Sequence, residues 1–382
     1  MGRPTPRSED VVIAGAGAAG LSVAAMLERR GIRPLMLERE AELARPWERR
    51  YESLRLNTPR PLSTMPGYRM PRRYGRWPTR GDMVEYLRDY PRRVGLRVEP
   101  QTEVTGLERD ELGWRVRSSR GELRSRCVVV ATGHDHDPRT PEWPGRETYG
   151  GELIHSSAYR EPSSFRGRDV LVVSARNSGS EIALELCRSG AARVRVSMRT
   201  PPNVVPREWV GVPLMYTGLP IDPLPDRVGD EAVWAVQRLI YGDLARWGLP
   251  RSPVGVQTDA RRRHKSTLID AGFVAALKAG ELELVAAVQS FDRREVVLAD
   301  GARIDPDVVI AATGYRGGLE PLVGHLGVLD ARGWPDLPRG GEHPAAAGLY
   351  FSGYWASMIG QLAHMRRDSR RIARGIARRL RR

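Results

Sequence analysis

The fold is decided by the stretch VVIAGAGAAG, residues 11–20. Its apolar residues 11–14 predict a buried strand, and the glycines that follow have the spacing Gly-x-Gly-x-x-Gly. In such a strand-to-helix turn, Gly15 permits the tight turn, Gly17 lets the backbone approach a pyrophosphate, and Gly20 lets the helix pack on the strand. The free N–H groups and positive dipole end of the following helix attract phosphate. The stretch therefore predicts a phosphate cradle for a dinucleotide, here called the first cradle.

The residues that follow the first cradle complete a βαβ unit. Apolar residues continue at helical spacing from Leu21 to Leu27, and Gly31 ends the predicted helix. A second apolar strand, residues 34–37, leads directly into Glu38. A carboxylate at this distance from the glycines is the usual acceptor for a ribose hydroxyl. Strand, glycines, helix and acid all indicate one bound dinucleotide.

An altered copy of the motif, the second cradle, reads VLVVSARNSG over residues 170–179. Ser174 and Arg176 stand where the first cradle has its first two glycines. Ser174 must make a tight turn with a Cβ atom, and Arg176 places a long side chain where a pyrophosphate would approach the backbone. Arg199, after the next predicted strand, is placed to pair with the 2′-phosphate of NADP.

The second cradle leaves three interpretations open. Arg176 blocks a nicotinamide dinucleotide, or its guanidinium pairs with a phosphate and binding is altered but real. Alternatively, the unit is a scaffold that holds no ligand.

Composition bounds the class of protein and its partners. The 382 residues are enough to form two domains. The net charge is +15, and almost all of the positive charges are arginines, since Lys265 and Lys278 are the only lysines. The arginines are spread along the chain rather than gathered in one module, so we predict a solvated basic surface and no nucleic-acid partner. The two cysteines, Cys127 and Cys187, form no CxxC pair and have no metal-ligand spacing. We therefore expect no metal site and a cytoplasmic location.

The C-terminal segment is a basic amphipathic helix with Ile372, Ile376 and Leu380 at a spacing of four residues. Such a helix can lie on an anionic membrane. Because its apolar face is thin, we expect it to pack on the protein instead, and we expect no membrane partner. Nothing in the sequence predicts the oligomeric state.

Several motifs, in order along the chain, resemble those of class B flavin-dependent monooxygenases, particularly the short plant-type branch. The first cradle with Glu38 is similar to the FAD site of that family. Residues 44–47, ARPW, lie where the family has a Gly-x-Trp segment, and residues 54–58, LRLNT, resemble the segment that carries an asparagine near the flavin. The most specific match is YGGELIHSSAY, residues 149–159, which is similar to the signature Phe-x-Gly-x-x-x-His-x-x-x-Trp/Tyr.

The resemblance implies an α/β fold with two Rossmann-like dinucleotide-binding domains, the second inserted in the first. We expect an FAD-binding domain formed by residues 1–150 and 305–382. Residues 151–304 would form the NADPH-type domain with its degenerate phosphate loop. Strands alternate with helices along the chain, which favours mainly parallel sheets.

The resemblance also implies an enzyme of specialised metabolism that uses FAD, NADPH and O2. A flavin C4a-(hydro)peroxide would oxygenate a small organic substrate, by N- or S-oxygenation or by oxidative decarboxylation. The altered second cradle motivates an alternative, an FAD-dependent oxidase or unusual redox enzyme with impaired or lost NADPH binding. A non-enzymatic flavin-carrying protein is a further alternative, against which the near-complete set of flavin-side motifs argues.

By the same resemblance, Asn57 is the expected catalytic residue. The expected cofactor-binding residues are Gly15, Gly17, Ala18, Ala19, Gly20, Glu38, Arg39, Trp47, Thr132, Gly133, Ser174, Arg176, Asn177, Ser178, Gly179, Arg199, Thr313, Gly314 and Gly353. Simpler roles remain open for three residues: Asn57 as a turn former, Trp47 as core, and His155 as a structural residue at the domain junction.

Overall fold

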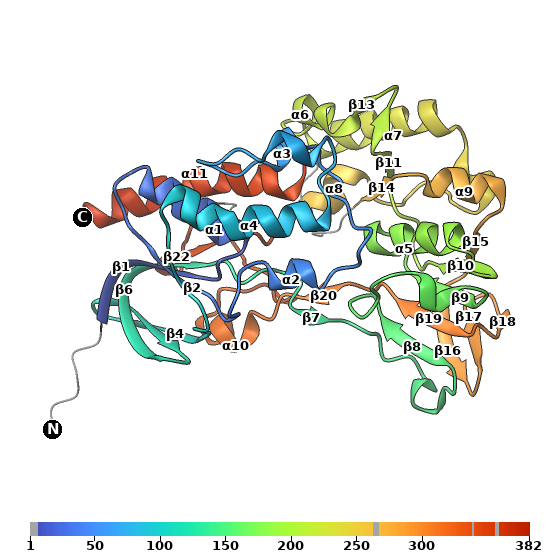
Figure 1. Cartoon of the computed structure of the whole chain (residues 1–382), viewed down its shortest axis with the longest axis horizontal. Helices are drawn as coiled ribbons and strands as arrows, with labels where there is room; N and C mark the ends of the chain where they lie inside the picture. Colours follow the sequence, from blue (N-terminus) through green and yellow to red (C-terminus); the bar gives the residue numbers. More distant parts are fainter. Residues whose placement is uncertain (1–6, 263–266, 338–339, 356–358) are drawn as a thin grey trace.

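The structure, a computed structural model, describes residues 7–262, 267–337, 340–355 and 359–382. Over these residues it is an α/β protein with two large, mainly parallel sheets, each covered by helices. Figure 1 shows one sheet in the left half of the molecule, around β1 (Arg7–Ala14) and β6 (Gly121–Val130), and the other in the right half, around β9 (Asp169–Val173) and β19 (Val308–Ala311).

The first sheet contains the strand that leads into the first cradle. Its order is β21-β22-β6-β1-β2-β3, parallel from β22 to β3, and β4 and β5 extend it as an antiparallel meander from β6. The strands are β1 (Arg7–Ala14), β2 (Leu35–Leu37), β3 (Arg97–Glu99), β4 (Val104–Asp110), β5 (Gly113–Ser118), β6 (Gly121–Val130), β21 (Glu342–His343) and β22 (Ala346–Phe351).

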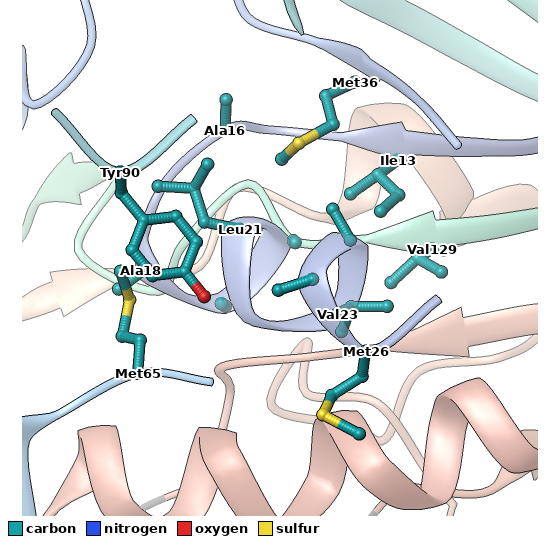
Figure 2. Close-up of a cluster of buried hydrophobic side chains, with 14 of the residues drawn as sticks. Ile13, Ala16, Ala18, Leu21, Val23, Met26, Met36, Met65, Tyr90 and Val129 are labelled. Carbon is teal, nitrogen blue, oxygen red and sulfur yellow. The ribbon is translucent and has the colours of Figure 1, made fainter. Parts of the chain in front are cut away.

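We call the first sheet with the helices packed on it the first half of the molecule, and the second sheet with its helices the second half. Helix α1 (Ala18–Glu28) lies at the centre of the first half, and its residues from Ala18 to Leu27 are all buried. In Figure 2, Ile13, Met36 and Val129 of the strands lie on one side of this helix, and Met26 points to the opposite side, toward the C-terminal helix. The helix is apolar on all sides because the sheet covers one side while α4 (Arg80–Val94) and α11 (Gln361–Leu380) cover others. The basic C-terminal helix therefore packs on the protein, as predicted, with Ile372 and Ile376 fully buried.

The second sheet has the order β15-β10-β9-β19-β8 and is parallel throughout. Its strands are β8 (Glu152–His155), β9 (Asp169–Val173), β10 (Arg193–Ser197), β15 (Glu283–Val285) and β19 (Val308–Ala311). Helices α5 (Asn177–Arg188) and α9 (Phe273–Ala279) share a buried core with this sheet. An antiparallel sheet of β16 (Val288–Asp292), β17 (Glu295–Leu298) and β18 (Arg303–Ile304) packs on Leu171, Val173 and Val309.

Strand β19 lies in a different sheet from the one that the sequence predicts. The sequence predicts that residues 305–382 belong to the FAD-binding domain. The strand instead pairs with β9 on one side and β8 on the other, inside the second sheet. Its residues are all buried, and an all-apolar strand suits the interior of either parallel sheet, so the sequence pattern alone did not tell the two sheets apart.

The remaining elements connect the two sheets or cover one of them, and one helix packs on the first sheet through Leu322 and Val323. The helices are α2 (Arg45–Glu48), α3 (Arg60–Ser63), α6 (Gly218–Ile221), α7 (Asp226–Tyr241), α8 (Val256–Arg262) and α10 (Glu320–Val323). The short strands are β7 (Asp137–Pro138), β11 (Val204–Pro206), β12 (Glu208–Trp209), β13 (Val212–Pro213), β14 (Leu268–Asp270) and β20 (Tyr315–Arg316). Within the described ranges, none of these helices or those above combines the length and apolarity that crossing a bilayer requires.

Candidate dinucleotide and active site

The first cradle has three glycines whose positions follow from the backbone around them. Gly15 has φ +98°, and a Cβ there would lie 2.5 Å from the carbonyl oxygen of Ala131. A Cβ at Gly20 would lie 2.1 Å from the carbonyl oxygen of Gly15. A Cβ at Gly17, in contrast, would meet no atom within 4 Å. Gly15 and Gly20 are therefore needed for the turn itself, and Gly17 faces open space.

This open space lies at the start of α1, where a helix carries unpaired N–H groups. Gly17 is the N-cap residue, and no side chain caps the helix there. Beside it, the carboxylate of Glu38 accepts hydrogen bonds from the backbone N–H of Ala16 at 2.8 Å and of Glu40 at 3.1 Å. Bare N–H donors, open space and an adjacent fixed carboxylate fit the pyrophosphate and ribose of a dinucleotide.

Two further predicted segments converge on the first turn of α1. Thr132 and Gly133 follow β6, and the Thr132 hydroxyl lies 2.8 Å from the hydroxyl of Tyr354. Gly353 has φ +94°, and a Cβ there would lie 2.8 Å from the Cβ of Ala19. Segments more than 200 residues apart in the sequence thus meet at the first cradle.

Arg39 and Trp47 lie near this site but have partners within the protein. The Arg39 guanidinium is 2.5 Å from a ring nitrogen of His136. Trp47, on α2, is partly buried against the hydrophobic core of the first half. The packing of Trp47 agrees equally with the core role and with the cofactor role.

The second cradle repeats the turn with different side chains. Ser174 has φ +100°, close to that of Gly15, and a Cβ at Gly179 would lie 1.8 Å from the Ser174 carbonyl oxygen. A non-glycine residue in such a conformation costs about 1–3 kcal/mol. The chain therefore keeps the cradle geometry at Ser174 in spite of the strain.

Arg176 takes the place in this turn that Gly17 has in the first. It is the N-cap residue of α5, and its side chain is partly buried. Burial lowers the pKa of the Arg176 guanidinium, and the nearby carboxylate of Asp259 on α8 opposes this effect. The side-chain oxygen of Asn177 accepts a hydrogen bond from the backbone N–H of Ile269 at 2.9 Å. At the first cradle, the position where a pyrophosphate would bind is open. At the second cradle, the equivalent position lies next to the cationic side chain of Arg176.

Four more of the predicted cofactor-binding residues lie around this turn, and the sequence assigns two of them, Thr313 and Gly314, to the FAD-binding domain. Ser178 is partly buried in the first turn of α5, and Arg199 is exposed just beyond β10. Thr313 and Gly314 follow β19, and the preceding Ala312 lies 3.3 Å from a Cβ placed at Gly179. The Thr313–Gly314 turn therefore flanks the second cradle, as Thr132–Gly133 flanks the first.

His155 joins two connecting segments. One ring nitrogen lies 3.1 Å from the carbonyl oxygen of Gly314 and the other 2.9 Å from the hydroxyl of Ser157. Its ring meets Tyr315 edge-on at 5.2 Å. Burial lowers the pKa of His155, which favours the neutral ring. These contacts favour the structural role, and they hold the end of β8 to the end of β19 within the second sheet.

Asn57 lies against a residue that the sequence reasoning missed. Its side-chain N–H donates to Glu181 on α5 at 2.6 Å. The other carboxylate oxygen of Glu181 accepts a hydrogen bond from the hydroxyl of Tyr51. The residue adjacent to Asn57, Thr58, packs against Gly360, where a Cβ would lie 2.0 Å from its methyl group. Asn57 therefore touches the second half through Glu181, and its own segment packs in both cores, with Tyr51 in that of the second half and Leu56 in that of the first.

Comparisons with known proteins agree with this arrangement. The family model for pyridine nucleotide-disulphide oxidoreductases matches residues 12–210, a range that includes both cradles. Probable indole-3-pyruvate monooxygenase YUCCA9 of Arabidopsis thaliana is 32% identical over 352 residues, which cover 90% of this chain and 83% of that protein. Indole-3-pyruvate monooxygenase YUCCA1 of Oryza sativa subsp. japonica is 33% identical over 349 residues, covering 90% and 86%.

Among solved structures, the flavin-containing monooxygenase from Stenotrophomonas maltophilia has a similar fold. It superposes with a TM-score of 0.74 at 24% identity, over 97% of this chain and 99% of that chain. Because the plant relatives match along nine-tenths of its length at 32–33% identity, the chain belongs to the class B flavin-dependent monooxygenase family.

Proposed function

We propose that this protein binds FAD at the first cradle, takes electrons from NADPH at the second, and oxygenates a small organic substrate with O2. The reaction would be N- or S-oxygenation or oxidative decarboxylation. FAD, when bound, supplies the hydride acceptance and oxygen activation that no amino-acid side chain provides.

The observation that carries the proposal is the uncapped start of α1. Its N–H groups face open space at Gly17, beside the fixed carboxylate of Glu38. In this proposal the α1 backbone holds the pyrophosphate, Glu38 holds a ribose hydroxyl, and Asn57 donates a hydrogen bond to the reacting oxygen. Donors held in place in this way can contribute about a hundredfold or more to a rate.

Substitution at Gly17 tests the FAD site. Because nothing lies within 4 Å of a Cβ there, Gly17→Glu should fold yet place a carboxylate where the pyrophosphate binds. We expect the wild-type protein to purify yellow and Gly17→Glu to lose FAD, measured by flavin absorbance after gel filtration. Gly150→Glu is the matched control, since the nearest atom to its Cβ is 3.9 Å away and it lies by β8 in the second half. A colourless wild-type protein that takes up no FAD at micromolar concentration would contradict the proposal.

Anaerobic mixing with NADPH tests the electron donor. Loss of flavin absorbance within the mixing experiment supports NADPH as the reductant. A second candidate function, an FAD-dependent oxidase or unusual redox enzyme reduced by its own substrate, is favoured by Ser174 and Arg176 at the second cradle. An FAD-loaded protein that NADPH fails to reduce would favour this second candidate.

We also propose the arrangement of the chain as two Rossmann-like domains with the second inserted in the first. The strand order supports it, because the first sheet draws on residues 7–130 and 342–351 and the second on residues 152–311. A cytoplasmic setting is proposed as well, supported by two cysteines that are both free.

A further inference from the structure

Glu181 lies one helical turn after the second cradle. Helix α5 begins at Asn177, directly after Arg176, and Glu181 follows four residues later. Its carboxylate accepts hydrogen bonds from Tyr51 and Asn57, two residues of the segment that connects the cores of the two halves. A single side chain thus links the helix of one cradle to the residue proposed to act beside the other.

Each carboxylate oxygen of Glu181 has its own donor. Asn57 donates to Oε1 at 2.6 Å and Tyr51 donates to Oε2. An amide NH2 group carries two N–H donors in one plane, so holding one of them fixes the direction of the other and of the amide oxygen. Glu181 therefore sets how Asn57 presents its remaining polar atoms.

Burial and the neighbouring groups shift the pKa of the Glu181 carboxyl group in opposite directions. Burial raises the pKa of this carboxyl, whereas the hydrogen bonds from Tyr51 and Asn57 and the nearby guanidinium of Arg207 favour the charged form. Glu185, one turn further along α5, opposes the charged form. Burial raises the pKa of Tyr51, so its hydroxyl stays protonated and donates.

We propose that Glu181 is a positioning residue that aligns the amide of Asn57 and thereby couples occupancy of the second cradle to the site at the first. This inference rests on the proposed function. A dinucleotide at the start of α5 would hold that helix, and Glu181 would transmit its position to Asn57.

The test uses the FAD-bound full chain and the visible absorption spectrum of its flavin. We expect NADP+ to perturb this spectrum in the wild type, and Glu181→Gln and Asn57→Ala each to reduce the perturbation. Glutamine offers one carbonyl oxygen where glutamate offers two, so it cannot serve Tyr51 and Asn57 on separate atoms. Loss of one such hydrogen bond corresponds to a drop of about two- to tenfold in the aligned population. The double variant should show no further loss, because both changes remove the same link.

Glu185→Gln is the matched control. Glu185 is on the same helix and also accepts a hydrogen bond from a tyrosine, Tyr159, at 3.0 Å. We expect this variant to keep the full NADP+ response. Isothermal titration should give NADP+ affinity in Glu181→Gln within a few-fold of wild type, since the residue lies one turn away from the cradle. If Glu181→Gln fails to fold, Tyr51→Phe, which frees one oxygen of Glu181, should reduce the response by a smaller factor.

The outcomes separate this inference from the proposed function. Glu181→Gln that responds like Glu185→Gln, or losses that add in the double variant, overturns the positioning role. A wild type that binds FAD but no NADP+ contradicts the proposed electron donor and the coupling together. In that case the flavin absorption spectrum without NADP+ tests the Glu181–Asn57 link. Both single variants and the double variant should shift this spectrum by the same amount. Shifts that differ between the single variants and add in the double variant overturn the link.

Discussion

Ser174 and Arg176 carry the largest difference between the two cradles. Gly15 and Gly17 leave the first turn unstrained and open, whereas Ser174 is held at φ +100° and Arg176 adds a cationic side chain. We expect Ser174→Gly/Arg176→Gly to be reduced by NADPH about tenfold faster than wild type, the scale of relieving one to two kcal/mol of steric conflict. Anaerobic stopped-flow absorbance measures this rate.

The same pair of changes at the far end of α5, Arg188→Gly/Ser189→Gly, controls for general loosening of the helix. Slower reduction in the cradle variant would mean that Arg176 is itself a phosphate ligand, because its guanidinium can pair with phosphate. Equally rapid reduction of the wild type and of the Ser174→Gly/Arg176→Gly variant would mean that the altered motif does not affect reduction by NADPH.

The two cysteines are expected to react poorly with thiol reagents. Burial raises the pKa of Cys127 to about 12 and that of Cys187 to about 11. Since the thiolate is the reactive form, only about one thiol in a thousand or fewer is ionised at pH 8. We expect a disulfide reagent to label Cys187 slowly and Cys127 only after unfolding, followed by absorbance in native buffer and in urea. Rapid labelling of both residues in native buffer would contradict the buried position of Cys127 and the raised pKa of Cys187.

At the residue scale, the sequence predicted the first cradle but not the partner of Asn57. Gly15, Gly20 and Glu38 are close in the chain, so their spacing alone implies the turn and the adjacent acid. Asn57 and Glu181 are 124 positions apart and meet only because the two halves pack together. Helical spacing assigns Glu181 to α5 but does not show what that face contacts.

At the scale of elements, α11 depends on a narrow apolar face. Ile372 and Ile376 are fully buried in the core shared with α1, while Arg374 between them is exposed. We expect Ile372→Ala to lower the free energy of unfolding by about 2–4 kcal/mol through lost burial and a cavity, measured by urea denaturation. Arg374→Ala is the control and should change it by less than about 0.5 kcal/mol. Similar losses in both variants would show that the helix does not pack through this face.

The starts of some helices are set by local signals that can be read from the sequence. Helix α4, for example, begins at a capping box in which Thr79 and Asp82 exchange hydrogen bonds at 2.8 and 3.1 Å. The assignment of β19 could not be predicted in the same way. A short apolar strand pairs with whichever sheet the connecting segments bring it to, and those segments carry no local signal of their destination.

At the scale of the whole molecule, the position of β19 gives a test of how the chain is divided. This strand lies between β9 and β8, so it holds β8 to the rest of the second sheet. A fragment of residues 151–314 contains every strand of that sheet, whereas residues 151–304, the range expected from the sequence, lack β19. We expect the longer fragment to unfold cooperatively in urea and the shorter one to show no cooperative transition, followed by circular dichroism. The two fragments differ only in residues 305–314, so a difference in cooperativity between them is due to that segment. Equal cooperativity in both would mean that β19 is dispensable to the second sheet, and failure of both would mean that this half folds only with the first.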